Sequence, residues 1–149
     1  MAKYFRTRFF VRLAILAFVG FVYWVSSIAG NVSSDCPLDE VEQAEEEIYD
    51  AYKHFIRVGE DAINARNMTA NITQMWGIVH EVENVTTPPC LLTAKNLAIR
   101  SMKTGIEGFE AVSAGNLVLA ESKFDVAGDL SESFEDELAR IHRCAPDCE

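Results

Sequence analysis

Four cysteines are the residues whose spacing most directly suggests chemistry: Cys36, Cys90, Cys144 and Cys148. An even number of cysteines in an exported domain is typical of paired disulfides. We expect Cys36 and Cys90 each to bond one member of the C-terminal pair, because long closed loops restrict the unfolded chain most, by about 4 kcal/mol each in the loop-entropy model. A redox pair at the C-terminus is disfavoured because three residues, instead of two, separate its cysteines. A four-cysteine zinc site would need shorter paired spacings.

The three histidines, His54, His80 and His142, do not form a recognisable ligand set. Helical di-iron sites use Glu-x-x-His, but the residues three positions before each histidine are Ala51, Gly77 and Ala139. Motifs for haem attachment, serine hydrolases, zinc proteases and phosphate loops do not occur in the sequence. We therefore expect no catalytic residue, no cofactor and no metal ligand.

Four asparagines begin Asn-x-Ser/Thr sequences: Asn31, Asn67, Asn71 and Asn84. Such sequences accept N-linked glycans in exported eukaryotic proteins. Three of the four lie at the ends of expected helices, where Asn and Thr are also favoured as caps. Both interpretations, glycosylation and helix capping, stay open.

An acidic run, Glu45-Glu46-Glu47 with Glu42 and Asp50 nearby, could attract a basic partner or divalent cations. It lacks the alternating oxygen ligands and the glycine of a calcium loop. We interpret it as a solubilising helix face.

The first thirty residues direct the chain into or across a membrane. Lys3, Arg6, Arg8 and Arg12 precede an apolar run over residues 13–25. Because basic residues are held in the cytoplasm during insertion, we expect everything after residue 30 to lie on the non-cytoplasmic side. That part holds 9 basic against 23 acidic residues, a charge of −14, which disfavours nucleic acid as a partner.

Two interpretations of residues 1–30 remain open. A cleaved signal peptide would use the small residues around Ser27 and Ala29. A retained anchor would span residues 9–30, with Arg8 and Arg12 at the inner interface and Tyr23 and Trp24 at the outer one. The protein is then either secreted or membrane-bound with an extracytoplasmic domain, joined by a short linker over residues 31–37.

Apolar residues recur at helical spacing through residues 38–149, without sustained strand alternation. At this spacing the apolar residues form a stripe along one face of each helix. These stripes predict helices over about 38–66, 70–84, 90–113 and 116–143, with a break at Pro88 and Pro89. Gly59 is a possible bend, and Gly105 and Gly108 would allow close approach of a neighbour. The last helix carries a heptad pattern: Leu117, Ala120, Phe124, Ala127, Ser131, Phe134, Leu138 and Ile141.

This pattern predicts an all-α fold, an antiparallel up-down-up-down four-helix bundle preceded by a transmembrane helix or signal peptide. In that topology the starts of the first and third helices and the end of the fourth lie together. We therefore expect all four cysteines to gather at one end of the bundle.

The sequence Thr87-Pro88-Pro89-Cys90, followed by Met102 and by Gly105-Ile106-Glu107-Gly108-Phe109, resembles small uncharacterised extracytoplasmic helical domains of bacterial secreted and lipoprotein-like chains. The resemblance covers roughly residues 80–135. It implies no activity, and Asp35 before Cys36 departs from the lipoprotein form.

These observations predict a non-catalytic interaction or accessory module that works through its helix faces. One alternative is a secreted four-helix signalling ligand, which resembles cytokines in helix count, disulfides and acceptor asparagines. The sequence is also compatible with a small-ligand carrier or a thiol redox protein.

The predicted disulfides can be tested by non-reducing peptide mapping of the natively isolated chain. We expect the Cys36 and Cys90 peptides each to be linked to a peptide holding Cys144 or Cys148. A bond between Cys144 and Cys148 themselves, or four free thiols, would contradict the prediction.

Overall fold

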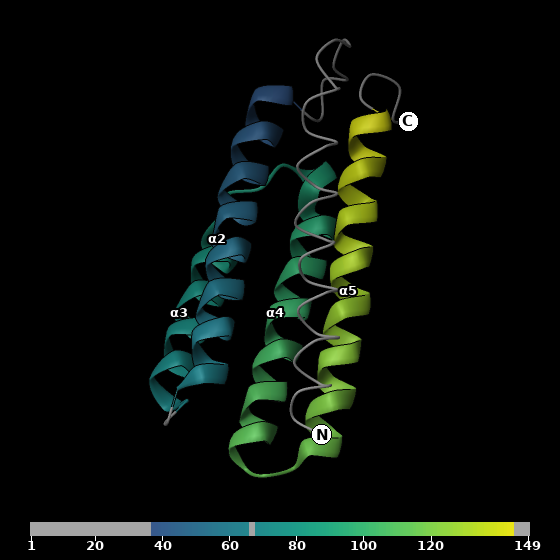
Figure 1. Cartoon of the computed structure of the whole chain (residues 1–149). Helices are drawn as coiled ribbons and strands as arrows, with labels where there is room; N and C mark the ends of the chain where they lie inside the picture. The colour runs from purple at the N-terminus through teal and green to yellow at the C-terminus, as the bar shows by residue number, and fades with distance from the viewer. Residues whose placement is uncertain (1–36, 66–67, 145–149) are drawn as a thin grey trace.

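The computed structural model describes residues 37–65 and 68–144 of the chain (Figure 1). The predicted leader and linker, with Arg8, Arg12, Tyr23, Trp24, Asn31 and Cys36, lie outside these residues, as do Asn67 and Cys148. The described residues form α2 (Leu38–Asn64), α3 (Thr69–Asn84), the 3-10 turn η1 (Pro89–Leu91), α4 (Leu92–Ser113) and α5 (Leu117–Cys144). They contain no strand, which confirms the all-helical prediction for this part of the chain.

The four helices run side by side as a bundle, and the chain direction alternates from each helix to the next (Figure 1). α4 and α5 form the most closely packed pair, while α2 packs on α3, and α3 packs on α4. The start of α2, the start of α4 and the end of α5 lie at one end, and the α4–α5 turn lies at the other (Figure 1).

Local chemistry sets the helix boundaries within a few residues of those predicted. α2 begins after Pro37, which is the N-cap, and Asp39 and Glu40 occupy its negatively charged first turn. The helix ends at Asn64 because Ala65 is extended. Pro89 starts η1, so α4 proper begins two residues later than expected.

Lys95 closes the C-terminal end of α3. Its ammonium group donates to the carbonyl oxygens of Glu83 at 2.8 Å and Val85 at 2.7 Å. A cation at this position satisfies carbonyls that lack intrahelical partners and matches the negative end of the helix dipole. This contact ties the short helix α3 to α4.

The predicted stripes form one apolar core, with corrections at particular positions. Ile78 and Ile106 are fully buried in this core, whereas Ile63 of α2 is exposed. Leu117, the first position of the predicted heptad, is also exposed. It lies in the first turn of α5, at the end of the bundle, where the described helices offer no layer to cover it.

A chain of buried hydroxyl groups crosses the middle of the core. The hydroxyl of Tyr52 lies 2.9 Å from Oγ of Ser101, and Ser101 donates to the carbonyl oxygen of Ala127 at 2.8 Å. Burial raises the pKa of Tyr52, and hydrogen bonds with Ser101 and Ser131 act in the opposite direction. The chain therefore links α2, α4 and α5 through groups that water cannot reach.

Two glycines make room for aromatic rings. A Cβ atom on Gly108 would lie 2.6 Å from Cε1 of Phe124, and Phe109 and Phe124 meet edge to face at 5.0 Å between ring centroids. Gly59 lies in the unbroken helix α2 under the ring of Phe109, so it provides space instead of the predicted bend.

No helix within residues 37–65 and 68–144 is both long enough and apolar enough to cross a membrane.

Replacing Gly108 should destabilise the domain. In Gly108→Ala the new methyl group clashes with Phe124, and we expect a loss of about 1–3 kcal/mol in the free energy of unfolding. The measurement is denaturant unfolding of the full-length chain in detergent micelles, followed by circular dichroism. Gly77→Ala is the matched control, because nothing lies within 4 Å of its Cβ position. It should stabilise α3 by about 0.5–1 kcal/mol, and equal effects of the two changes would contradict the role of Gly108 in packing.

Candidate functional site

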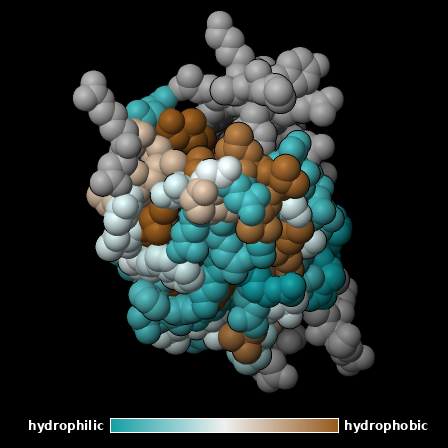
Figure 2. Space-filling model, turned by 90° about the horizontal axis from the view of Figure 1, so that it is seen from below, coloured by the Kyte–Doolittle hydropathy of each residue, from teal (hydrophilic) through white to brown (hydrophobic). Residues whose placement is uncertain are grey.

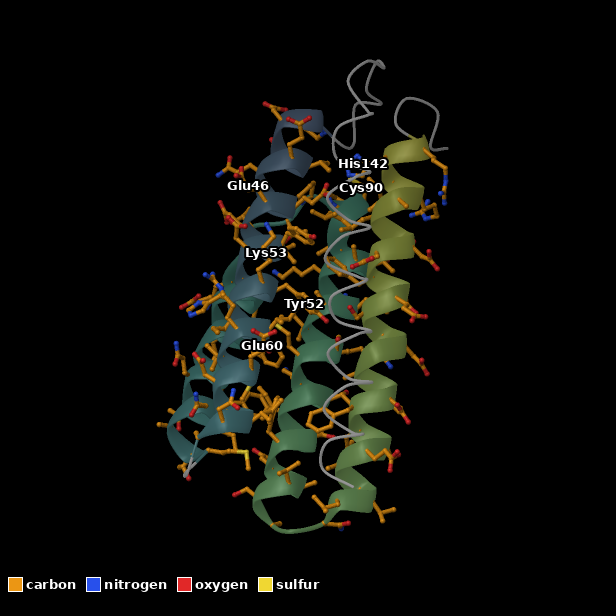
Figure 3. The ribbon with its side chains drawn as sticks, in the orientation of Figure 1. Glu46, Tyr52, Lys53, Glu60, Cys90 and His142 are labelled. Carbon is orange, nitrogen blue, oxygen red and sulfur yellow. The ribbon has the colours of Figure 1, made fainter. Side chains whose placement is uncertain are left out.

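The structure places Cys90 at the end of the bundle that the sequence predicted. Cys90 lies in η1 near His142 of α5 (Figure 3). It is disulfide-bonded, and it is the one cysteine whose side chain belongs to the described part of the chain. The predicted pairing therefore stays a prediction, because the partner lies outside the described side chains.

Two of the predicted glycan acceptors lie in α3. Asn84 is exposed at the last position of the helix and donates to the carbonyl oxygen of His80 at 2.8 Å. Asn71 is half-buried in the first turn. Neither of them is the N-cap, which is Met68 and makes no side-chain cap bond.

Each histidine contacts one polar side chain. Nε2 of His54 lies 3.3 Å from Nε2 of Gln74, and Nδ1 of His80 lies 2.8 Å from Glu83. A hydrogen bond from Lys103, followed by the one with His80, lowers the pKa of Glu83. Groups of three or more His, Cys, Asp or Glu that could hold a metal ion do not occur among the described residues.

His142 forms a contact that sequence reasoning missed. Its Nε2 lies 2.8 Å from Oε2 of Glu45, a residue 97 positions away, in a partly buried setting between α5 and α2. The hydrogen bond with Glu45 raises the pKa of His142, and burial opposes that shift. No local signal in the sequence could have paired these residues, since only the fold brings them together.

Three residues of the acidic run, Glu46, Glu47 and Asp50, line a groove between α2 and α3, whereas Glu45 contacts α5. The groove has a volume of about 900 Å³, and Glu46, at its edge, points away from α5 (Figure 3). Its net negative charge attracts basic side chains and cations. The charged residues that line it are Glu46, Glu47, Asp50, Arg57, Asp61 and Glu81.

Three consecutive apolar residues are exposed at the opposite end of the bundle, in the first turn of α5. The exposed fractions of Leu117, Val118 and Leu119 are 66%, 81% and 43%. We call these three residues the apolar tip. Figure 2, which views this end of the molecule, shows apolar surface next to hydrophilic surface.

Hydrogen bonds hold the apolar tip in place. Gly115 has a φ angle of +76°, and its backbone N–H donates to the carbonyl oxygen of Val112. The backbone N–H of the next residue, Asn116, donates to the carbonyl oxygen of Ala111. These two bonds are the Schellman arrangement that closes a helix C-terminus. Oδ1 of Asn116 then accepts from the backbone N–H of Leu119 at 3.1 Å, so one residue ends α4 and caps α5.

Comparisons with known proteins found no relative of this chain. No protein-family model matches the chain, and no match was found among curated proteins or solved structures. Function is therefore inferred from the surfaces of the molecule itself.

Removing the cap should loosen the turn that presents the apolar tip. We expect Asn116→Ala to lower the free energy of unfolding by about 1 kcal/mol, because the N–H of Leu119 loses its acceptor. Asn96→Ala, at an exposed position inside α4, is the control and should change stability by less than about 0.5 kcal/mol. Urea denaturation of both variants checks this, and equal stability of Asn116→Ala and the parent chain would contradict the capping role.

Proposed function

We propose that this protein is a non-catalytic interaction module that binds a protein partner through the apolar tip. The observation that carries the proposal is the exposure of three apolar residues that are consecutive in the chain, Leu117, Val118 and Leu119. Isolated exposed apolar residues are ordinary, but adjacent ones with a polar rim are typical of contact sites.

The rigidity of the apolar tip supports this proposal. The Schellman bonds and the Asn116 cap fix the first turn of α5 before any partner arrives. A preformed surface loses less conformational entropy on binding than a mobile loop. The later positions of the heptad are buried or half-buried, so the exposure of Leu117 at its start is compatible with selection for contact instead of folding.

The charges around the apolar tip favour a protein over an anionic membrane. Glu110 and Glu121 lie within about one turn of the tip along α4 and α5, and both are exposed. They repel phosphate headgroups. A partner surface with an apolar centre and a neutral or basic rim would complement the tip.

The location of the module is part of the proposal. The basic residues before the apolar run of residues 13–25 support a location of the domain outside the cytoplasm, either anchored or released. If the anchor is retained, the start of α2 is the end nearest the membrane, and the apolar tip at the opposite end faces away from it (Figure 1). A release of the domain by cleavage, with a glycan at Asn67 or Asn71, would favour the signalling-ligand alternative.

Site-specific photo-crosslinking tests the proposal. A benzophenone amino acid at position 118 of the full-length chain should give a discrete adduct in native membranes or culture medium. The same probe at Thr93, exposed at the other end of α4, is the matched control and should give no such adduct.

A double variant makes the test specific. Leu117→Ser with Leu119→Ser should lower the yield of the position-118 adduct at least tenfold, because each apolar side chain buried in an interface contributes about 1.5–3 kcal/mol and about 1.4 kcal/mol corresponds to tenfold in affinity. The fold should remain intact, since both side chains are exposed. An adduct of unchanged yield in the double variant, or equal adducts at positions 93 and 118, would contradict the proposal.

A further inference from the structure

The first and last described helices meet across a line of side chains. The backbones of α2 and α5 approach each other less closely than those of α4 and α5. Long side chains bridge the distance, and the rings of Tyr52 and Phe134 lie 5.8 Å apart between centroids. We call this contact the α2–α5 seam, formed by Glu45, Tyr49, Tyr52, Phe134, Glu135 and His142.

Two titratable groups of α5, Glu135 and His142, lie in the seam. His142 pairs with Glu45 at 2.8 Å, and both side chains are partly buried. Glu135 lies two turns earlier on α5, is also partly buried, and has no ion-pair partner among the described residues. Both groups are better accommodated when protonated, His142 because the proton creates the ion pair and Glu135 because the neutral carboxyl tolerates burial.

The charged and titratable surroundings of these two groups are mostly acidic. Tyr49 and Tyr52 of α2 and Glu132 and Asp136 of α5 interact with Glu135. Glu42 and Glu45 of α2 interact with His142. α4 contributes the hydroxyl of Ser101, which is bonded to Tyr52. Loss of both protons therefore leaves a charged, partly buried Glu135 carboxylate beside Glu132 and Asp136, and it removes the positive charge of His142 that Glu42 and Glu45 favour.

We propose that the α2–α5 seam is a pH-responsive joint, closed when Glu135 and His142 are protonated and loosened when both have lost their protons. The joint connects the α2–α3 hairpin to the α4–α5 hairpin. It is independent of the apolar tip, which lies at the other end of α5 (Figure 1).

The direction of the pH effect follows from linkage. Burial, and then the charges of Asp136 and Glu132, raises the pKa of Glu135 to about 7. Between its ordinary value of 4.5 and about 7, the folded state binds more protons than the unfolded state, so stability falls as the pH rises through this window. The raised pKa of His142 acts with the same sign, because its ion pair is present below the unfolded value of 6.5 and is lost as the pH passes the folded value.

Hydrogen exchange of the full-length chain in neutral detergent micelles tests the joint. Exchange is followed by mass spectrometry from pH 5.5 to 8.0 and corrected for the intrinsic pH dependence of amide exchange. We expect protection of peptides within residues 45–52 and 131–142 to fall about tenfold across this range, since a pKa shift of one unit corresponds to a tenfold change. Peptides of α4 within residues 98–109 should change much less.

Matched variants assign the effect to the two groups. Glu135→Gln should flatten most of the pH profile, whereas Asp129→Asn, at an exposed acid on the same helix that is not among the charges acting on Glu135, should retain it. His142→Gln should lower protection at pH 5.5 and reduce the remaining slope. A flat profile for the parent chain, or the same slope in parent, Glu135→Gln and His142→Gln, would overturn the proposal.

A second measurement covers the case in which Glu135→Gln does not fold. The pKa of Glu135 in the parent chain can be followed by NMR of its labelled side-chain carboxyl carbon. A titration midpoint above about 6 is expected for a partly buried carboxyl of this kind. A midpoint near the ordinary glutamate value would overturn the proposal.

Discussion

The hydrogen bond between Tyr52 and Ser101 constrains how the whole bundle can pack. If α2 slid along α4, this bond would break. A buried hydroxyl without a partner costs about 1–3 kcal/mol, so the bond resists such a shift. Ser101 is in turn bonded to the backbone of α5 at Ala127. Among the described residues no buried side-chain nitrogen or oxygen atom lacks a hydrogen-bond partner, so the register satisfied at Tyr52 is also consistent with the rest of the core.

This register gives the two sides of the bundle different packing. α4 and α5 lie closest together where Gly108 admits the ring of Phe124. α2 and α5 stand farther apart and meet through Tyr52, Phe134, and the pair of Glu45 and His142. A close apolar contact on one side is insensitive to pH, whereas the α2–α5 seam on the other side holds Glu135, whose pKa is raised to about 7, and His142, whose pKa is also raised.

The same geometry places the features that could meet a partner on the outside of the described core. α2 is longer than α3, and the groove lined by Glu46, Asp50 and Glu81 lies between them. At the far end, the three-residue turn between α4 and α5 holds Leu117 and Val118 in solvent. The proposed function therefore depends on what the helices present after their stripes have been buried.

Some properties of this protein follow from the amino-acid order alone. Apolar residues at helical spacing, such as Val41, Ala44 and Ile48, specify a buried helix face, because the period of the helix brings them to one side. Pro88 and Pro89 specify a break between two helices, because proline has no backbone N–H and its ring clashes with the preceding helical turn. The helices and most of the core positions could therefore be predicted, as could the place of Cys90 at the start of α4.

Other properties were decided only by the tertiary structure. The sequence could not pair Glu45 with His142, since contacts between residues 97 positions apart depend on the relative placement of helices. It could not show that Leu117 stays exposed, because a heptad position is buried only if a neighbouring helix extends far enough to cover it. Periodicity specifies which face of a helix is apolar, but the length and placement of the neighbouring helices decide which part of that face is covered.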